Sequence, residues 1–488
     1  MNMEKQNAFA NYEVGNTFLD EVFTSPGTPK KHYQKVLNQF SKFSIRDFKQ
    51  LNEYSKISFF NQGVTFAVYS DNAKGVERIF PFDLFPRIIP FKEWEKLEAG
   101  ILQRNIAINL FLKDIYHGKK ILRDKVVPAS LIFSSNFYNK HMEGILPPGE
   151  IYTHVSGTDL IKHSDGEYYV LEDNVRCPSG VSYVLSNREA MKRSLSKLFQ
   201  SYDVMPVHDY PEQLLSIIQS VAPNGIDNPT CAVLTPGMYN SAYYEHSFLA
   251  QSMGIQLVEG RDLFVDKNFV YMKTIHGPKR VDVIYRRLDD DFIDPLVYRS
   301  DSVLGVPGLM GAYRSGNVSL INAPGTGAAD DKAVYTYIPQ IIKYYLGEEP
   351  ILKNVHTYRC EIDEDFKYVL ENMSQLVIKP VDESGGYGIF IGNKSTKEER
   401  EKFRDVISSN RRKYIAQPIM SLSVHTTFIE DCEAFEPRHI DLRSYCLLGN
   451  KKHFVLKGGL SRVALKKGSL VVNSSQGGGS KDTWVLEE

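Results

Sequence analysis

The stretch GTDLIKHSDGEYYVLEDNVRCPSG, residues 157–180, predicts a β-hairpin whose two strands bring acidic side chains together. The pair Asp165-Gly166 suits a two-residue type I′ turn, which fixes the register of the strands that flank it. Counting outward from that turn places Asp159 directly opposite Glu172, so we expect the two carboxylates to lie close together on one face.

This face is a candidate metal site. Asn174 lies two residues beyond Glu172 and therefore projects from the same side of the strand. Carboxylates that converge with an amide oxygen repel one another unless a cation lies between them, and such ligands suit Mg²⁺ or Mn²⁺ held jointly with phosphates. A hairpin with solvated acidic side chains is the alternative that these residues leave open.

A second motif, LVIKPVDESGGYGIFIG at 376–392, indicates a phosphate site. Lys379 ends a buried strand, and Gly385, Gly386 and Gly388 allow backbone N–H groups to approach phosphate oxygens. The spacing is not that of a P-loop. An ordinary glycine-rich β-turn is the alternative.

Other basic and polar residues strengthen the phosphate interpretation. Lys332, in NAPGTGAADDKAVY, stands at the start of a predicted helix, and Gln417, in YIAQPI, ends a strand where a backbone could meet an adenine edge. Arg443 in IDLRSY and Arg462 in GGLSRVA are candidates for contacting a phosphoryl group. Each arginine taken singly is more often part of a surface ion pair.

Composition limits the possible partners. The chain has 488 residues, with 58 basic and 59 acidic side chains and a net charge of −1, so it offers no electrostatic case for nucleic acid or an anionic membrane. Neither a membrane span nor a signal peptide is apparent, which predicts a cytoplasmic protein. The five scattered cysteines are expected to be reduced and mostly buried thiols.

Periodicity indicates an α/β protein. Residues 91–116 repeat apolar side chains at helical spacing, and residues 231–237, 239–254 and 255–265 read as strand, helix and strand, a βαβ unit that a strand at 281–287 extends. Strands dominate from about residue 318 onward. The glycine- and serine-rich stretch NSSQGGGSKD, 473–482, is expected to be mobile.

Read in the order 230–488 and then 150–180, the chain resembles an ATP-grasp enzyme such as glutathione synthetase. The metal-binding hairpin precedes the rest, so the chain resembles the circularly permuted ATP-grasp family, type 2. The segments that carry this resemblance are FPFDLFPRII, LEDNVRCPSGVSY, YNSAYYEH, GVPGLMGAYRSGNVSLINAPGTG and SSQGGGSKDTW.

The resemblance implies a domain order. It comprises an N-terminal α/β extension (1–150), the permuted metal hairpin (151–200), a Rossmann-like pre-ATP-grasp substrate domain (201–325) and the ATP-grasp subdomains (326–488).

The resemblance also implies a carboxylate–amine ligase that uses ATP and Mg²⁺ to join small-molecule substrates of amino-acid or peptide-like character. Lys332 and Lys379 would hold the ATP phosphates, and Gln417 stands in the adenine hinge where many ATP-grasp enzymes have an acidic residue. Arg443 and Arg462 would contact the transferring phosphate, and Arg286, with Arg287, a substrate carboxylate. An ATP-dependent phosphotransferase and a non-catalytic ATP-binding module remain the alternatives.

Overall fold

A computed structural model of the chain describes residues 9, 12–15, 17–70, 73–383, 388–450, 452–473 and 477–487. Within these ranges, no helix combines the length and apolar character that crossing a membrane requires. All five cysteines lie in the described ranges and have free thiols.

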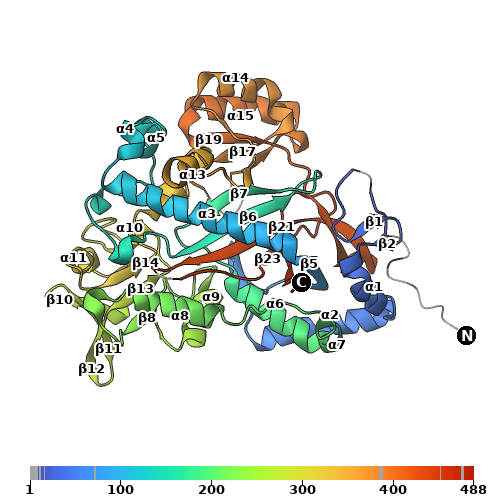
Figure 1. Cartoon of the computed structure of the whole chain (residues 1–488), viewed down its shortest axis with the longest axis horizontal. Coiled ribbons are helices and arrows are strands. Elements are labelled where there is room, and N and C mark those ends of the chain that lie inside the picture. Colours follow the sequence, from blue (N-terminus) through green and yellow to red (C-terminus); the bar gives the residue numbers. More distant parts are fainter. Residues whose placement is uncertain are drawn as a thin grey trace, which may run out of the picture.

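A nine-stranded sheet forms the centre of the molecule, and both ends of the chain contribute to it (Figure 1). The order is β15-β7-β6-β21-β23-β24-β5, with β20 and β22 also paired to β21. The bounds are β5 (Phe82–Ile89), β6 (Val155–Lys162), β7 (Tyr168–Asn174), β15 (Lys353–Asn354), β20 (Val424–Ile429), β21 (Ala434–Leu448), β22 (His453–Val455), β23 (Leu460–Val463) and β24 (Gly479–Val485).

The predicted hairpin is strands β6 and β7, and Asp159 does pair with Glu172. The predicted type I′ turn is wrong, however, because the loop has three residues, Ser164 to Gly166. The N–H of His163 donates to the carbonyl of Glu167, and the carbonyl of His163 accepts from the N–H of Gly166. A bulge between Asp159 and Leu160 then restores the expected pairing. The longer loop and the bulge shift the register in opposite directions, so their effects cancel at the acidic pair.

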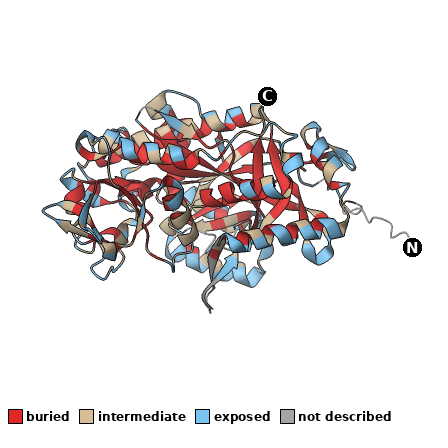
Figure 2. Ribbon diagram, turned by 90° about the horizontal axis from the view of Figure 1, so that it is seen from below, coloured by how far each residue is buried: buried red, intermediate tan, exposed pale blue. Residues whose placement is uncertain are grey.

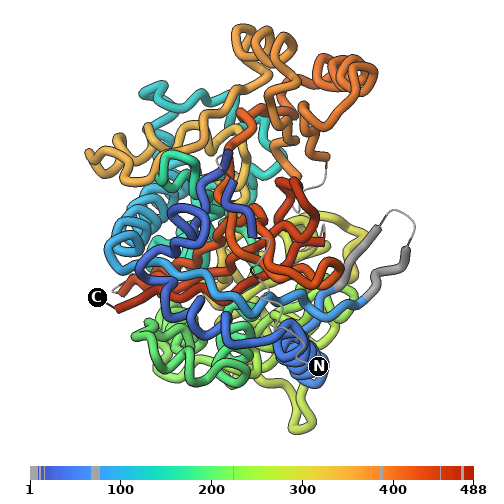
Figure 3. The backbone as a smooth tube through the Cα atoms, turned by 90° about the vertical axis from the view of Figure 1, so that its right-hand side faces the viewer, coloured from blue at the N-terminus to red at the C-terminus, as the bar shows by residue number. Residues whose placement is uncertain are grey.

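The expected mobile stretch at 473–482 is also wrong for its last four residues. Gly479 begins β24, a fully buried strand that pairs antiparallel with β23 and parallel with β5. Trp484 in this strand is 0% exposed and packs in a hydrophobic core cluster. Gly478, just before this strand, lets the chain pass close to Val472, since a Cβ atom there would lie 2.0 Å from the Val472 carbonyl oxygen. The C-terminal strands, red in Figure 3, run through the middle of the molecule, and residues 474–476 lie outside the described ranges.

A separate four-stranded sheet confirms the βαβ prediction. Its order is β14-β13-β8-β9, and all its pairs are parallel. Helix α9 (Tyr243–Met253) connects β8 to β9 and ends at Gly254, whose φ of 66° is typical of a helix C-terminus. The strands are β8 (Cys231–Leu234), β9 (Gln256–Val258), β13 (Val283–Arg286) and β14 (Ser319–Ile321), and β10 (Leu263–Asp266), β11 (Phe269–Thr274) and β12 (Gly277–Val281) form a three-stranded sheet.

A third sheet carries the predicted phosphate strand and lies under two helices at the top of Figure 1. Its order is β16-β19-β17-β18, formed by β16 (Tyr358–Arg359), β17 (Leu376–Pro380), β18 (Phe390–Ile391) and β19 (Tyr414–Pro418). Helices α14 (Asp363–Asn372) and α15 (Lys397–Ser409) cover it. Thr396 and Glu399 form a capping box at the start of α15.

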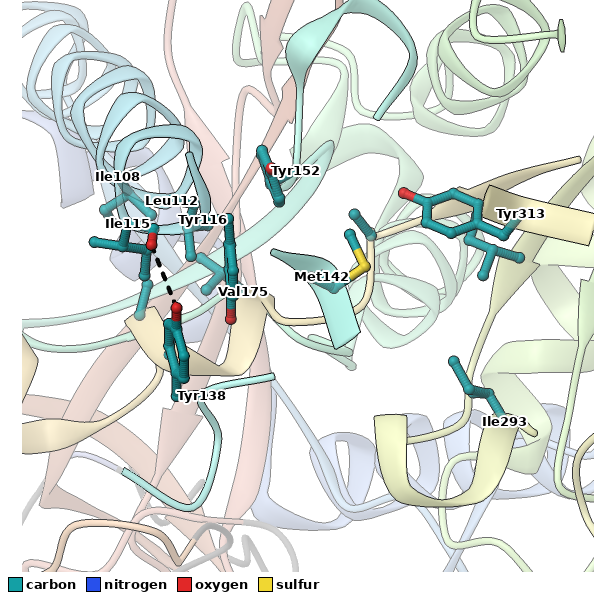
Figure 4. Packing of buried hydrophobic residues seen from close by; sticks show 14 of the residues in the cluster. Ile108, Leu112, Ile115, Tyr116, Tyr138, Met142, Tyr152, Val175, Ile293 and Tyr313 are labelled. Carbon is teal, nitrogen blue, oxygen red and sulfur yellow. Dashed lines mark hydrogen bonds between the residues drawn. The ribbon is translucent and has the colours of Figure 1, made fainter. Parts of the chain in front are cut away.

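The long helix α3 (Phe91–Tyr116) has the predicted bounds and packs its apolar side inward. Ile108, Leu112, Ile115 and Tyr116 join the largest core cluster, and the Tyr138 hydroxyl donates to the carbonyl of Ile115 (Figure 4). Buried residues concentrate on the strands and on the inward sides of the helices (Figure 2).

The remaining elements surround these sheets. They are β1 (Phe23–Ser25), β2 (Thr28–Pro29), α1 (Gln34–Phe40), α2 (Ile45–Asn61), β3 (Thr65–Ser70), β4 (Ala73–Ile79), α4 (Lys120–Arg123), α5 (Ala129–Phe133), α6 (Val181–Ser194), α7 (Ser196–Phe199), α8 (Tyr210–Ser220), α10 (Asp290–Ile293), α11 (Leu309–Arg314), α12 (Lys332–Tyr335) and α13 (Ile338–Leu346).

Candidate functional site

One pocket gathers most of the side chains that the sequence singled out. It lies between the central sheet, the β17–β19 sheet and the segment 470–473. The predicted site residues that line it are Asp159, Glu172, Lys332, Lys379, Gln417 and Arg462, and its other lining residues include Asp441, Glu383 and an apolar set (Leu171, Val377, Pro380, Ile389, Ile391, Pro418, Met420, Leu422, Leu470, Val471 and Val472).

The two lysines enter the pocket from different elements. Lys379, on β17, donates from Nζ to Oε1 of Gln417 at 2.8 Å, and Gln417 donates from Nε2 to the Thr357 hydroxyl at 3.0 Å. Lys332 begins α12, and its Nζ donates to the carbonyl of Glu383 at 2.7 Å. Both ammonium groups thus line the same cavity, as phosphate ligands would.

Lys379 has an altered protonation equilibrium. Burial and, to a smaller extent, the nearby charge of Lys332 lower its pKa to about 8, although the carboxylates of Glu172 and Asp159 oppose this shift. The contact with Gln417 is to a neutral amide and supplies no compensating charge. An anionic ligand in the pocket would favour the charged form of Lys379.

Asp159 is held by two arginines from neighbouring strands. Arg443, directly across the ladder on β21, donates from Nε to Oδ1 at 2.6 Å and from Nη2 to Oδ2 at 2.8 Å. Arg462 on β23 donates from Nη2 to Oδ2 of Asp159 at 2.8 Å and also pairs with Asp441. Burial alone would raise the pKa of Asp159, but the two guanidinium groups outweigh it and hold that pKa below its ordinary value.

Glu172 has looser contacts than Asp159. Its side chain is 26% exposed, and its carboxylate lies 3.4 Å from Lys332 Nζ and 4.0 Å from Arg443 Nη2. Asn174 follows two residues later on β7, and its Nδ2 is buried without a hydrogen-bond partner in the described part of the chain.

These side chains fit Mg²⁺ better than a metal ion whose ligands all come from the protein. No cluster of three or more His, Cys, Asp or Glu side chains suited to a metal occurs among the described residues. Mg²⁺ is usually held by one or two carboxylates together with substrate phosphates, which the pair Asp159 and Glu172 beside two lysines would allow. The unpartnered Nδ2 of Asn174 is a donor and would bind an acceptor such as a phosphate oxygen, whereas a cation would need its Oδ1.

The structure does not bring Arg286 into this pocket. Its guanidinium donates to the carbonyls of Asn322, Leu288 and Ala323 and pairs with Asp290, so it fastens the carboxyl end of the parallel sheet. Gly388 has a φ of 68°, which favours glycine, whereas Gly385 and Gly386 lie outside the described residues.

Sequence reasoning missed the apolar side of the pocket. This side is lined by two segments. One is Leu470, Val471 and Val472, which follow β23, and the other is Met420 and Leu422, which follow the predicted hinge at Gln417. The only available signal was the short apolar run LVV after the turn residues KKGS. Asp441 was visible as a neighbour of Arg443 on one strand, but its pairing with Arg462 depends on the register of β21 with β23.

Comparisons with known proteins agree with this arrangement. A family model described as circularly permuted ATP-grasp type 2 matches residues 86–464. An uncharacterized protein of Synechocystis is 52% identical over 476 residues, which cover 98% of each chain. A Frankia casuarinae protein provisionally named glutamate–cysteine ligase 2-2 is 38% identical over 472 residues, 96% of this chain but only 54% of that protein.

The fold has a relative among solved structures. A glutathione synthetase-like effector from Globodera pallida in its apo form superposes with a TM-score of 0.54 at 12% identity, over 90% of this chain and 96% of that one. At this identity the likeness concerns the fold alone. The family match spans most of the chain, and it includes both the hairpin and the strands that line the pocket. The chain therefore belongs to the circularly permuted ATP-grasp type 2 family.

Proposed function

We propose that this protein is an ATP-dependent ligase that activates a substrate carboxylate and joins it to an amine, releasing ADP and phosphate. The observation that carries the proposal is the convergence of Lys332, Lys379, Asp159, Glu172 and Arg462 on one pocket with an apolar side. Family membership and the provisional ligase name of the Frankia relative support the same reaction class.

The pocket has two chemically different parts. The apolar side chains, among them Val377, Ile391 and Met420, would contact the adenine ring, next to the strand end at Gln417 and Pro418. Lys332 and Lys379 would hold phosphate oxygens, because ammonium groups bind phosphates as point charges. Gly385, Gly386 and Gly388 belong to the loop proposed to approach the phosphates.

Asp159, Glu172 and Asn174 would hold Mg²⁺, or Mn²⁺ in its place. When bound, such a cation neutralises phosphate charge and fixes the orientation of the phosphates. Arg443 and Arg462 would contact the phosphoryl group as it moves, since arginines stabilise the charge of transferring phosphates. Both now contact Asp159, so each would shift part of its hydrogen bonding to the nucleotide.

The chemistry then needs two displacements. An oxygen of the substrate carboxylate attacks the γ-phosphorus of ATP, the bond to the bridging oxygen breaks, and ADP leaves with that electron pair. The amine then attacks the acyl carbon, phosphate leaves, and the nitrogen loses a proton. Positioning and charge neutralisation supply most of the rate in the first step.

The parallel sheet β14-β13-β8-β9 is, in this proposal, a Rossmann-like substrate domain within residues 201–325. Residues 151–200 and 326–488 form the permuted ATP-grasp part, and residues 1–150 extend it by contributing β5 to the central sheet. Amino-acid or peptide-like substrates are proposed on the strength of the Frankia relative's name.

Trapping the acyl phosphate tests the reaction class. The purified protein is incubated with Mg-ATP, a pool of amino and dicarboxylic acids, and hydroxylamine, and the products are analysed by mass spectrometry. We expect a hydroxamate with equal amounts of ADP and phosphate, none of which forms with Lys379→Met. A stable phosphorylated product in place of the hydroxamate would make the protein a phosphotransferase.

A further inference from the structure

Ser179 links the end of the parallel sheet to Arg443, the arginine that holds Asp159 of the candidate ATP pocket. Its carbonyl accepts hydrogen bonds from Arg443 Nη1 at 3.3 Å and from the Tyr445 hydroxyl at 3.1 Å. Its hydroxyl accepts from Arg287 Nη2 at 2.5 Å. Arg287 directly follows β13, so one short turn contacts both the arginine that holds Asp159 and the end of the parallel sheet.

Glu245 fixes the same turn from α9. Its Oε2 accepts from the backbone N–H of Gly180 at 2.6 Å and from both the N–H and the hydroxyl of Ser182, at 3.1 and 3.0 Å. Helix α6 begins at Val181, and Gly180 before it supplies no side-chain cap. Glu245 therefore caps α6 from another element, with its negative charge at the helix N-terminus, where it is favourable.

Arg287 and Glu245 form a buried ion pair at 3.1 Å, and each side chain is 1% exposed. Burial alone would lower the pKa of Arg287, but Tyr285 and Glu245 outweigh it and raise that pKa above its ordinary value. The Nε of Arg287 is buried without a hydrogen-bond partner among the described residues. Buried pairs of this kind add little stability compared with apolar residues but fix the geometry of what they contact.

The turn is also tightly packed at Gly180. Gly180 has a φ of 115°, and a Cβ atom there would lie 2.5 Å from the Tyr445 hydroxyl oxygen. The position of the Ser179 carbonyl is thus set by Tyr445 on one side and by Glu245 and Arg287 on the other.

We propose that Glu245 and Arg287 are positioning residues for the nucleotide site, which act by holding the Ser179 carbonyl where it orients Arg443. This inference rests on the proposed function, because it assumes that Arg443 contacts the terminal phosphate of ATP. Among the described residues, the hydrogen bonds of the pair go to Ser179, Gly180, Ser182 and Tyr285, none of which lines the pocket, and its link to Arg443 runs through the peptide of Ser179 and Gly180. Its loss should therefore resemble partial loss of Arg443.

The test compares affinities for Mg-AMPPNP and Mg-ADP by calorimetry, a readout that needs no knowledge of the substrates. Removing one charge would leave the other buried and unpaired, so the main variant is the double replacement Glu245→Gln with Arg287→Met. Ser179→Ala, which removes only the hydroxyl contact, is the milder second variant. Asp83→Asn is the matched control, since Asp83 belongs to a buried ion pair with Lys481, 7% and 0% exposed, that does not contact Ser179.

We expect the double replacement to weaken AMPPNP binding about tenfold and ADP binding less than about threefold, and Ser179→Ala to change the same ratio in the same direction. Asp83→Asn should leave the ratio unchanged even where it lowers the melting temperature. Adding Arg443→Lys to the double replacement should cause no further loss beyond that of Arg443→Lys alone, because residues acting through one contact are not additive.

Two results would overturn the inference, and they are distinguishable. If Arg443→Lys reduces the AMPPNP-to-ADP ratio but the double replacement and Ser179→Ala do not, Glu245 and Arg287 only stabilise the fold. If neither Arg443→Lys nor Lys379→Met changes nucleotide affinity, the proposed ATP pocket itself is wrong and the positioning role falls with it.

Discussion

The guanidinium of Arg462 and the carboxylate of Asp159 contact each other at 2.8 Å, between Nη2 and Oδ2, although 303 residues separate them in the chain. Arg462 also pairs with Asp441, and Arg443 holds both oxygens of Asp159. Asp159, Asp441 and Arg462 are each at most 6% exposed. Because buried charges must be compensated, loss of one member of this cluster should destabilise the protein, and the same three side chains line the pocket.

Arg462→Met should therefore lower stability. It removes the guanidinium that the buried carboxylates of Asp159 and Asp441 share, and we expect a loss of about 3–5 kcal/mol in urea unfolding. Arg299→Ala is the control, because the Arg299–Asp301 pair has side chains 52% and 70% exposed; it should change stability by less than about 1 kcal/mol. Equal stability of the two variants would contradict the compensation argument.

Nucleotide affinity should depend on the protonation of Lys379. Its pKa is lowered to about 8, so the free protein carries the charge below that pH and loses it above. Affinity for Mg-ADP should be constant from pH 6.5 to 7.5 and fall as the pH rises through 8. Calorimetry across that range checks this, and a profile that stays flat to pH 9.5 would show that Lys379 does not titrate there.

The same shift has a consequence for stability. The pKa of Lys379 falls from 10.5 to about 8 on folding, so the unfolded chain binds the extra proton more tightly between these values. The charged lysine thus opposes folding at pH 7, and this cost disappears as the pH rises toward 10.5. Lys379→Met should raise stability at pH 7 by about 1–2 kcal/mol while weakening nucleotide binding. Lys343→Met, whose side chain is 54% exposed, should do neither.

Gln417→Glu tests why the strand end carries an amide. A carboxylate 2.8 Å from Lys379 Nζ would raise the pKa of the lysine and repel nucleotide phosphates. We expect Mg-ADP affinity at pH 7 to fall about tenfold and the pH at which affinity declines to move upward. The Thr357 hydroxyl, which donates to the carbonyl of Val355, can rotate to donate to the new carboxylate instead, so the fold should be preserved at a small cost in stability. An unchanged pH profile would mean that Gln417 does not influence Lys379.

Glu172→Ala separates the metal role from stability. The carboxylate is 26% exposed and its ion-pair distances are 3.4 and 4.0 Å, so its removal should change the unfolding free energy by less than about 1 kcal/mol. Binding of Mn²⁺ in the presence of ADP, measured by electron paramagnetic resonance, should be lost. Glu167→Ala, on the same hairpin and 43% exposed, should bind Mn²⁺ normally. Unaltered Mn²⁺ binding by Glu172→Ala would refute the metal assignment.

The sequence predicted those parts of the site that depend on local pattern. Lysines at strand and helix ends are short-range features, and the structure has them. Asp159 also pairs with Glu172 as predicted, but it does so through a longer loop and a compensating bulge that the pattern did not predict. Helix α3 had its predicted bounds because its apolar spacing is regular over its whole length.

What the sequence did not predict depends on contacts between distant strands. Arg286 and Arg287 are neighbours in the chain, yet one binds backbone carbonyls of the parallel sheet and the other reaches Ser179. The glycine- and serine-rich stretch before Trp484 reads as a flexible tail, but its residues 479–482 belong to β24, which lies buried between β5 and β23. Composition alone carries no information about such partners.

A substitution in the hairpin loop distinguishes the observed three-residue loop from a type I′ turn, because it should lower stability in the first and raise it in the second. Asp165 accepts hydrogen bonds from the N–H of Glu167 and the hydroxyl of Tyr169, both at 2.9 Å, and keeps a negative φ, whereas Gly166 has a φ of 83°. Asp165→Gly should therefore destabilise the protein by about 1 kcal/mol, because it removes these bonds and adds backbone freedom.

In a type I′ turn, residue 165 would need a positive φ and the same change would stabilise the protein. Gly166→Ala should destabilise it in either case, so it serves as the control. Nucleotide affinity should stay within about twofold in both variants, because β21 fixes Asp159 independently of the loop.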